Sequence, residues 1–199
     1  MKITSAEFVK SARDLESCPE SDLGEMAFIG RSNVGKSSLI NLLAERNGLA
    51  KTSSTPGRTT LINFFRINNS WTLVDLPGYG YAKRSKADQA EFNEFVSDFL
   101  VNRPNLICAF VLIDAKIPPQ RLDLEFVEWI VNNEIPFALI FTKTDKTKPD
   151  ALSRNIASFK GALAERCDGV PKVLAASTKS KKGRLEVLNF IEKAVAVRR

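Results

Sequence analysis

The segment at residues 30–37, G-R-S-N-V-G-K-S, constrains the fold of this chain more than any other. An apolar run at 26–29 precedes it and an apolar-rich run at 39–43 follows it, which predicts a strand, a phosphate-binding loop and a helix in that order. Its two glycines let backbone amides and the helix N-terminus approach anionic oxygens. Lys36 would place a positive charge beside the β- and γ-phosphates, and the Ser37 hydroxyl would suit Mg²⁺, which prefers oxygen ligands. A glycine-rich turn that binds no ligand is the alternative.

The composition excludes several classes of chemistry. The 199 residues include no histidine, which excludes histidine-based triads, histidine general bases and histidine metal ligands. The three cysteines have no C-x-x-C spacing, which argues against a zinc site or a disulfide scaffold. A net charge of +6 favours a polyanionic partner, with nucleic acid as the preferred hypothesis. We expect neither a signal peptide nor a membrane span, and therefore a cytoplasmic protein.

The hydrophobic pattern beyond the phosphate loop alternates between strands and helices. Apolar runs at 106–113, 137–141 and 172–176 are typical of strands in a parallel sheet. The runs at 61–67 and 71–75 flank an Asn-Asn pair, which predicts a two-residue hairpin. We expect a three-layer α/β fold: a six-stranded, mostly parallel sheet with one antiparallel edge strand, and helices on both faces. Residues 25–199 would form this single domain, with residues 1–24 as an extension packed on it.

Two loops after the phosphate loop carry residues that suit a nucleotide and its metal. In the irregular segment 51–60, which we expect to be a mobile loop, the Thr59 hydroxyl could complete the Mg²⁺ shell; a solvated threonine is the alternative. At the end of the run 71–75, Asp75 offers a carboxylate for the metal or its waters. Gly78 offers an N–H that can approach the γ-phosphate without a Cβ in the way. An ordinary turn would explain the same Asp, Pro and Gly.

A fourth loop, residues 142–145, would select the base. The carboxylate of Asp145 can accept hydrogen bonds from the N1–H and 2-amino groups of guanine, while the stem of Lys143 covers the base plane. Adenine has an acceptor at N1 and no 2-amino group, so it would leave that carboxylate unpaired. A helix N-cap is the alternative role for Asp145. The joint occurrence of the four loops in this order favours a guanine nucleotide site.

These motifs resemble those of translation-factor-class small GTPases, over essentially the whole chain. Within that class, residues 30–38, the S-T-P-G-R-T segment at 54–59 and the D-L-P-G-Y-G-Y-A segment at 75–82 closely resemble the EngB family, also called YihA or YsxC. These are bacterial GTP-binding proteins implicated in large ribosomal subunit assembly and cell-division septation. The resemblance implies a P-loop GTPase (G domain) fold and hydrolysis of GTP to GDP and phosphate. It also implies a monomer whose partners are the rRNA and proteins of the large ribosomal subunit, and no membrane.

The resemblance further implies roles for individual residues. Ser37 and Thr59 would bind Mg²⁺, with Asp75 as the carboxylate noted above, and Lys36, Thr59 and Gly78 would act in catalysis. In the loop after the last strand, a backbone N–H would meet the guanine O6. The residues implied to contact GTP or GDP are Gly30, Arg31, Ser32, Asn33, Val34, Gly35, Lys36, Ser37, Ser38, Gly57, Arg58, Thr59, Thr60, Leu61, Asp75, Leu76, Pro77, Gly78, Thr142, Lys143, Thr144, Asp145, Ala176, Ser177 and Thr178.

Three positions bear on the rate of hydrolysis and on the choice of base. Thr142 stands where the N-K-x-D motif has asparagine, a change that EngB members share. Tyr79 stands where many GTPases place a water-orienting glutamine, so we expect slow hydrolysis without a partner. Asn33 matches a position that coordinates K⁺ in some related GTPases, which makes K⁺ stimulation a further expectation.

Basic residues flank two of the nucleotide loops and suggest the partner. Such clusters are usually solvated faces, but their position here predicts a GTP-dependent contact with ribosomal RNA. Two other functions remain open at this point: a P-loop ATPase or nucleoside kinase, and a nucleotide-stabilised RNA-binding scaffold with incidental hydrolysis. The basic residues are Lys83, Arg84, Lys86, Lys179, Lys181, Lys182, Arg184, Arg198 and Arg199.

Overall fold

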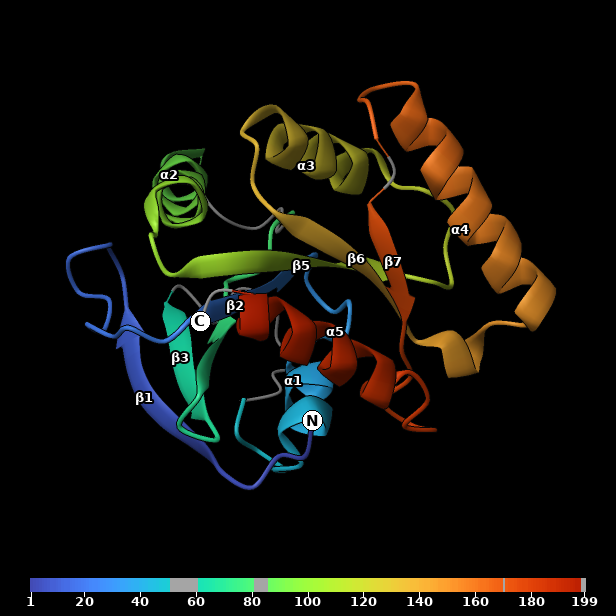
Figure 1. The fold of residues 1–199 in the computed structure, drawn as a ribbon. Coiled ribbons are helices and arrows are strands. Elements are labelled where there is room, and N and C mark those ends of the chain that lie inside the picture. Colours follow the sequence, from blue (N-terminus) through green and yellow to red (C-terminus); the bar gives the residue numbers. More distant parts are fainter. Residues whose placement is uncertain (51–60, 81–85, 170, 198–199) are drawn as a thin grey trace.

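The computed structural model describes residues 1–50, 61–80, 86–169 and 171–197, and its centre is a seven-stranded sheet (Figure 1). The strand order is β1-β3-β4-β2-β5-β6-β7. Strands β4, β2, β5, β6 and β7 are parallel, whereas β3 pairs antiparallel with both β1 and β4. The strands are β1 (Ala6–Ala12), β2 (Glu25–Gly30), β3 (Ile62–Ile67), β4 (Trp71–Asp75), β5 (Leu106–Asp114), β6 (Phe137–Thr142) and β7 (Lys172–Ala175).

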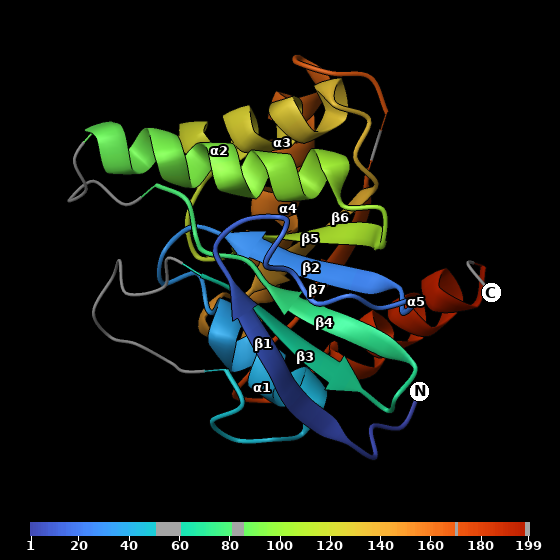
Figure 2. The ribbon, with the colours of Figure 1, turned by 90° about the vertical axis from the view of Figure 1, so that its left-hand side faces the viewer.

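Helices cover both faces of the sheet, so the three-layer α/β prediction is confirmed (Figures 1 and 2). Helices α1 and α5 lie on one face and share a buried cluster with it, and α2, α3 and α4 do the same on the other. Within the described ranges, no helix combines the length and apolar character needed to cross a membrane. The helices are α1 (Lys36–Ala44), α2 (Lys86–Asn102), α3 (Arg121–Asn132), α4 (Pro149–Ala164) and α5 (Arg184–Val197), with a short 3-10 helix, η1 (Thr144–Lys146).

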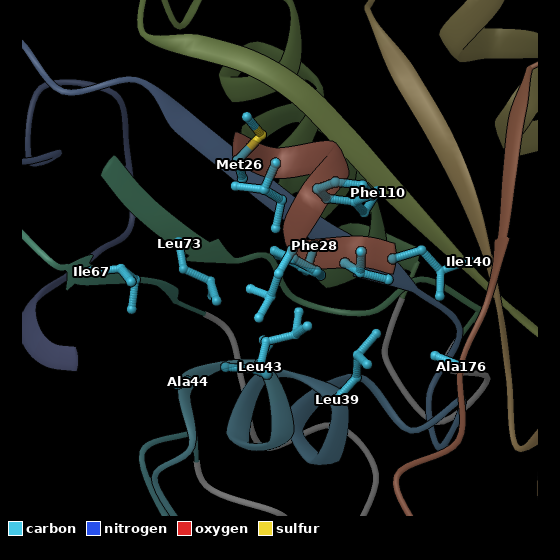
Figure 3. Close-up of a cluster of buried hydrophobic side chains, with 14 of the residues drawn as sticks. Met26, Phe28, Leu39, Leu43, Ala44, Ile67, Leu73, Phe110, Ile140 and Ala176 are labelled. Atoms are coloured by element: carbon cyan, nitrogen blue, oxygen red, sulfur yellow. The ribbon is translucent and has the colours of Figure 1, made fainter. Parts of the chain in front are cut away.

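The central strand β2 carries the phosphate loop at its carboxyl end, and packing on the face covered by α1 and α5 holds this strand against the helix that follows the loop. Every residue of β2 is buried, as expected of a central parallel strand. Phe28 stacks on Phe110 of β5 with ring centroids 4.9 Å apart. Leu39 and Leu43 of α1 belong to the same cluster and point toward the sheet (Figure 3). The first helix is therefore anchored to the strand that precedes it, and the loop between them is held at both ends.

Two details of the predicted sheet were wrong. Over the described parts of the chain the sheet has seven strands rather than six, because residues 6–12 add β1 to the outside of β3. The antiparallel strand, β3, is consequently not at the edge. Strand β1 lacks the usual alternation because its register shifts between Phe8 and Lys10, and the residues between its buried terminal alanines are mainly exposed. Nothing in the hydrophobic pattern therefore distinguished this segment from an irregular extension.

The predicted hairpin is confirmed, but three residues (68–70) rather than two connect its strands, and the first of them ties down the N-terminus. Asn68 and Asn69 both have a φ of 50°, which suits the tight turns that join antiparallel strands. The Asn68 Oδ1 accepts hydrogen bonds from the Thr4 and Ser5 amides at 2.7 and 3.1 Å, and its Nδ2 donates to the Lys2 carbonyl at 2.7 Å. The Asn68 side chain thus supplies hydrogen-bond partners that the backbone before β1 would otherwise lack.

Replacing Asn68 with alanine should lower the free energy of unfolding by about 2 kcal/mol, because hydrogen bonds are removed and alanine adopts a left-handed backbone poorly. Asn69→Ala is the matched control. It carries the same backbone cost, but among the described residues its side chain has no hydrogen-bond partner, so about 1 kcal/mol is expected. Urea denaturation of the two variants measures the difference, and equal losses of stability would contradict the anchoring role of Asn68.

Candidate nucleotide-binding site

The phosphate loop has the geometry that its glycines predicted. Gly35 precedes α1 with a φ of 103°, a conformation that residues with a Cβ rarely adopt. Gly30 is needed for a different reason: a Cβ at this position would lie only 2.8 Å from the Leu112 carbonyl oxygen of the neighbouring strand β5. The loop therefore leaves β2 against β5 and enters α1 with its first helical N–H groups facing the loop, the arrangement that binds phosphate.

Lys36 and Asp75, predicted to serve phosphate and metal, lie in direct contact. The Lys36 Nζ donates a hydrogen bond to the Asp75 Oδ1, and both side chains are largely buried. Ser37 adjoins Lys36 in the first turn of α1. Among the described residues there is no cluster of three or more acidic or thiol side chains that could enclose a metal. One carboxylate and one hydroxyl fit Mg²⁺, which usually keeps several waters and takes its other ligands from substrate phosphates.

The loop after β4 packs directly on the phosphate loop. The Leu76 amide donates to the Phe28 carbonyl at 3.0 Å, and the Ser32 amide donates to the Tyr79 carbonyl at 3.4 Å. Between them, a Cβ at Gly78 would lie only 2.8 Å from the Gly30 carbonyl oxygen. A glycine at this position is therefore required for the two loops to approach each other.

The third element of the site, the loop after β6, is also tied to the phosphate loop. Lys143 has a φ of 58°, and its Nζ donates to the Asn33 carbonyl at 2.7 Å and to the Asp114 Oδ2 at 2.6 Å. The Lys143 side chain also passes Gly35, since a Cβ there would lie 4.0 Å from the Lys143 Cε. The stem of Lys143 thus crosses from the base-selecting loop to the phosphate loop.

Asp145 and the loop after β7 form the remaining part. The Ser177 hydroxyl donates to the Asp145 Oδ1 at 2.7 Å, and chiefly this hydrogen bond holds the pKa of the exposed Asp145 carboxyl below its usual value. The Thr144 amide lies 3.5 Å from the Ala176 carbonyl oxygen, which places the two loops side by side. Asp145 does not cap α4, whose N-cap is Lys148, so the alternative structural role is wrong.

The chain is similar in sequence to known proteins. Residues 25–143 match the family described as "50S ribosome-binding GTPase". A probable GTP-binding protein EngB of Bacteroides fragilis is 52% identical over 192 residues, which cover 96% of each chain. The EngB protein of Christiangramia forsetii is also 52% identical, over 96% of this chain and 97% of its own. The chain belongs to the EngB family of GTP-binding proteins.

Solved structures agree with this membership of the EngB family. A crystal structure of a probable EngB superposes with a TM-score of 0.70 at 25% identity, covering 87% of this chain and 99% of that one. A crystal structure of Era bound to MgGDPNP and 16S ribosomal RNA has a TM-score of 0.68 at 22% identity, over 86% of this chain and 56% of that one, and shows the shared fold. The protein is therefore a P-loop GTPase, which decides against the ATPase and nucleoside kinase alternatives.

Thr142, which stands in place of the motif asparagine, has a structural role. Thr142 is buried at the end of β6, and its Oγ1 donates to the Val34 carbonyl of the phosphate loop at 2.6 Å. A hydroxyl is sufficient for this contact because only one donor is needed. The replacement of the amide therefore leaves the link between the base loop and the phosphate loop intact.

Tyr79 lies in the position that many GTPases give to a water-orienting glutamine, but its side chain packs on α3. The ring stacks on Phe126 with centroids 4.5 Å apart, and the hydroxyl donates to the Asp123 Oδ1 at 2.9 Å. Burial, followed by the charge of Asp123, raises the pKa of Tyr79 well above its usual value. The phenol therefore keeps its proton and is already engaged as a donor.

Some residues that contribute to the site were not predicted from the sequence, and some predicted residues lie outside the described parts of the chain. Asp114 and Asp123 were not predicted, although Asp114 ends the buried apolar strand β5, a position typical of ligand loops. Arg184, predicted to belong to a basic surface, instead donates to the Leu42 and Leu43 carbonyls at 2.9 and 3.0 Å and so caps α1. The predicted residues outside the described parts are Gly57, Arg58, Thr59, Thr60, Lys83, Arg84, Arg198 and Arg199, together with the proposed mobile loop at 51–60; the side chain of Lys86 is not described either.

Proposed function

We propose that this protein is a GTP/GDP switch that acts in assembly of the large ribosomal subunit, with a link to cell-division septation, and that hydrolyses GTP slowly without a partner. The observation that carries the proposal is the convergence of Lys36, Asp75 and the Asp145 loop on one end of the sheet. The description of the matching family as ribosome-binding supports the partner. The absence of membrane contacts, the monomeric state and a cytoplasmic location belong to the same proposal.

In this proposal each loop has one task. Lys36 and the amides of residues 30–38 hold the phosphates, Gly78 donates its N–H to the γ-phosphate, and Asp145 reads guanine beside residues 176–178. Ser37, Asp75 and Thr59 would hold Mg²⁺, which would neutralise charge on the phosphoryl oxygens. The segment 57–61 would complete the contacts with the nucleotide. K⁺ beside Asn33 is a further element of the proposal.

Hydrolysis would be slow because the Tyr79 phenol is engaged by Asp123 and offers no base to the attacking water. Lys36 and the loop amides would still stabilise charge on the phosphoryl group. A bound partner or the backbone would then have to orient the water, which links turnover to the ribosomal complex.

Exposed lysines beside the base-reading loops support RNA as the contact. The loop after β7 presents Lys179, Lys181 and Lys182, and the adjoining loop after β6 presents Lys146 and Lys148. The charges of Lys179 and Lys146 both lower the pKa of the Asp145 carboxyl. These five lysines, here called the lysine face, would therefore border the nucleotide. Cations clustered in this way bind phosphate backbones through release of counterions.

Purified large ribosomal subunits should co-sediment with the protein in the presence of a non-hydrolysable GTP analogue and much less with GDP. The double variant Lys179→Gln/Lys182→Gln should reduce binding in the analogue-bound state about tenfold. It should also lower the salt slope by about 2, because each of the two lysines would neutralise one RNA phosphate. Sedimentation at several salt concentrations measures both quantities.

Lys2→Gln/Lys10→Gln is the matched control, because it removes the same charge from exposed lysines in the N-terminal segment and β1, at the opposite edge of the sheet from β7. It should leave the salt slope nearly unchanged. Equal sedimentation with GDP and the analogue would overturn the switch, and equal effects of the two double variants would overturn the lysine face.

A further inference from the structure

A buried carboxylate on α3 joins two loops of the nucleotide site. Asp123 lies in the first turn of α3 and is only 3% exposed. Its Oδ1 accepts the 2.9 Å hydrogen bond from the Tyr79 hydroxyl, and its Oδ2 lies 3.9 Å from the Arg31 Nη1. Arg31 belongs to the phosphate loop and Tyr79 to the loop after β4. One side chain therefore connects both loops to a rigid helix.

The Tyr79 and Arg31 contacts favour the charged form of Asp123. Burial, with a smaller contribution from the charge of Asp114, raises the pKa of the Asp123 carboxyl above its usual value, and the Tyr79 hydrogen bond and the charge of Arg31 offset only part of that rise. A buried carboxylate without such partners would be costly, because it loses hydration and gains nothing in return. Asp123 thus favours the arrangement in which both loops stay in place.

The same contacts fix the backbone of Gly78. Arg31 and Tyr79 form a parallel β-bridge, and the Ser32 amide donates to the Tyr79 carbonyl at 3.4 Å. Gly78, the residue before Tyr79, lies against the Gly30 carbonyl with no room for a Cβ. If Tyr79 left α3, the bridge and the adjacent position of Gly78 would lose their outer support.

We propose that Asp123 is a positioning residue that contributes more to the binding of GTP than to the binding of GDP. By holding Tyr79 and Arg31 it keeps Gly78 beside the phosphate loop, where its N–H can meet the γ-phosphate without prior ordering of the loop. GDP lacks that phosphate, so Asp123 contributes little to GDP binding. The inference rests on the proposed function, because it requires Gly78 to contact the γ-phosphate.

Tyr79→Phe is the mildest test, since it removes the hydroxyl and keeps the ring that stacks on Phe126. The affinity for a fluorescent non-hydrolysable GTP analogue should fall about three- to tenfold, while the affinity for fluorescent GDP should change less than about twofold. Fluorescence titration of both nucleotides gives the ratio. An unchanged ratio, or an equal reduction for both nucleotides, overturns the proposal.

Two substitutions of Asp123 separate positioning from packing. Asp123→Asn keeps an oxygen that can accept the Tyr79 hydrogen bond, so it should retain most of the affinity for the GTP analogue, whereas Asp123→Ala should reduce that affinity and leave the affinity for GDP nearly unchanged. The double variant Tyr79→Phe/Asp123→Ala should be no worse than Asp123→Ala, because both changes break the same hydrogen bond. Additive effects in this cycle would contradict the direct link.

Glu128→Gln is the matched control on the same helix. Glu128 pairs at 2.8 Å with Arg166, which follows the end of α4, and its neutralisation should leave both affinities unchanged. Thermal unfolding of each variant shows whether it folds. If Asp123→Ala does not fold, Tyr79→Phe still decides the test. Failure of the wild-type protein to bind GDP would instead overturn the proposed function itself.

Discussion

Replacing Lys36 with alanine should weaken the binding of both GDP and GTP about 10- to 100-fold. The Lys36 ammonium is largely buried beside the phosphate loop, where a hydrogen bond from a charged donor contributes about 1.5–3 kcal/mol. Both nucleotides carry the β-phosphate, so both should be affected. The measurement is a titration with fluorescent GDP and a fluorescent GTP analogue in the presence of Mg²⁺.

The Lys36 variant needs a control for folding, because it also removes the partner of the buried Asp75. Thermal unfolding with and without nucleotide separates the two effects. Lys116→Ala is the matched lysine control: Lys116 is exposed in the loop after β5, and its removal should change either affinity less than about twofold. Wild-type affinity in a folded Lys36→Ala variant would exclude the phosphate loop as the nucleotide site.

Residues of the candidate site could be predicted from the sequence where their chemical type is not explained by packing of the hydrophobic core. Gly35, Lys36 and Asp145 lie in loops that follow apolar runs, where the hydrophobic pattern alone does not call for a glycine, a lysine and a carboxylate in fixed order. The parallel strands then bring these distant positions together, because their carboxyl ends share one edge of the sheet. Local spacing and this rule of topology were sufficient to predict that these loops converge.

The interactions that the sequence did not predict depend on tertiary neighbours. By sequence alone, Asp123 is an ordinary acidic residue in the first turn of a helix, favourable for the helix dipole, and only the structure shows it buried under Tyr79. Arg184 resembles an exposed cation, yet the approach of α5 to the end of α1 turns it into a helix cap. Strand β1 was missed for the same reason, since its pairing with β3 is specified by the partner and not by its own alternation.

Changing Asp145 to asparagine should lower the affinity for GTP and GDP about 100-fold and create affinity for xanthosine nucleotides. Guanine presents two donors, N1–H and the 2-amino group, and a carboxylate can accept from both. An asparagine side chain has an NH2 group where aspartate has its second carboxylate oxygen. This donor opposes the 2-amino group of guanine but can bind the C2 carbonyl of xanthine. The loss of one charge-assisted hydrogen bond, at about 1.5–3 kcal/mol, together with the opposed donors at the 2-amino group, accounts for the size of the reduction.

The environment of Asp145 makes this exchange a clean test of base recognition. The Ser177 hydroxyl that donates to Asp145 can donate equally to an amide oxygen, and Asp145 is exposed, so folding should be preserved. Asp150→Asn, an exposed carboxylate in the first turn of α4, removes the same charge nearby and should leave the base preference unchanged. Competition by GDP, ADP and xanthosine diphosphate against a fluorescent nucleotide measures the exchange. The substitution should change base preference only through the contact between residue 145 and the group at C2 of the purine. If the asparagine variant still prefers guanine, another part of the protein recognises the base.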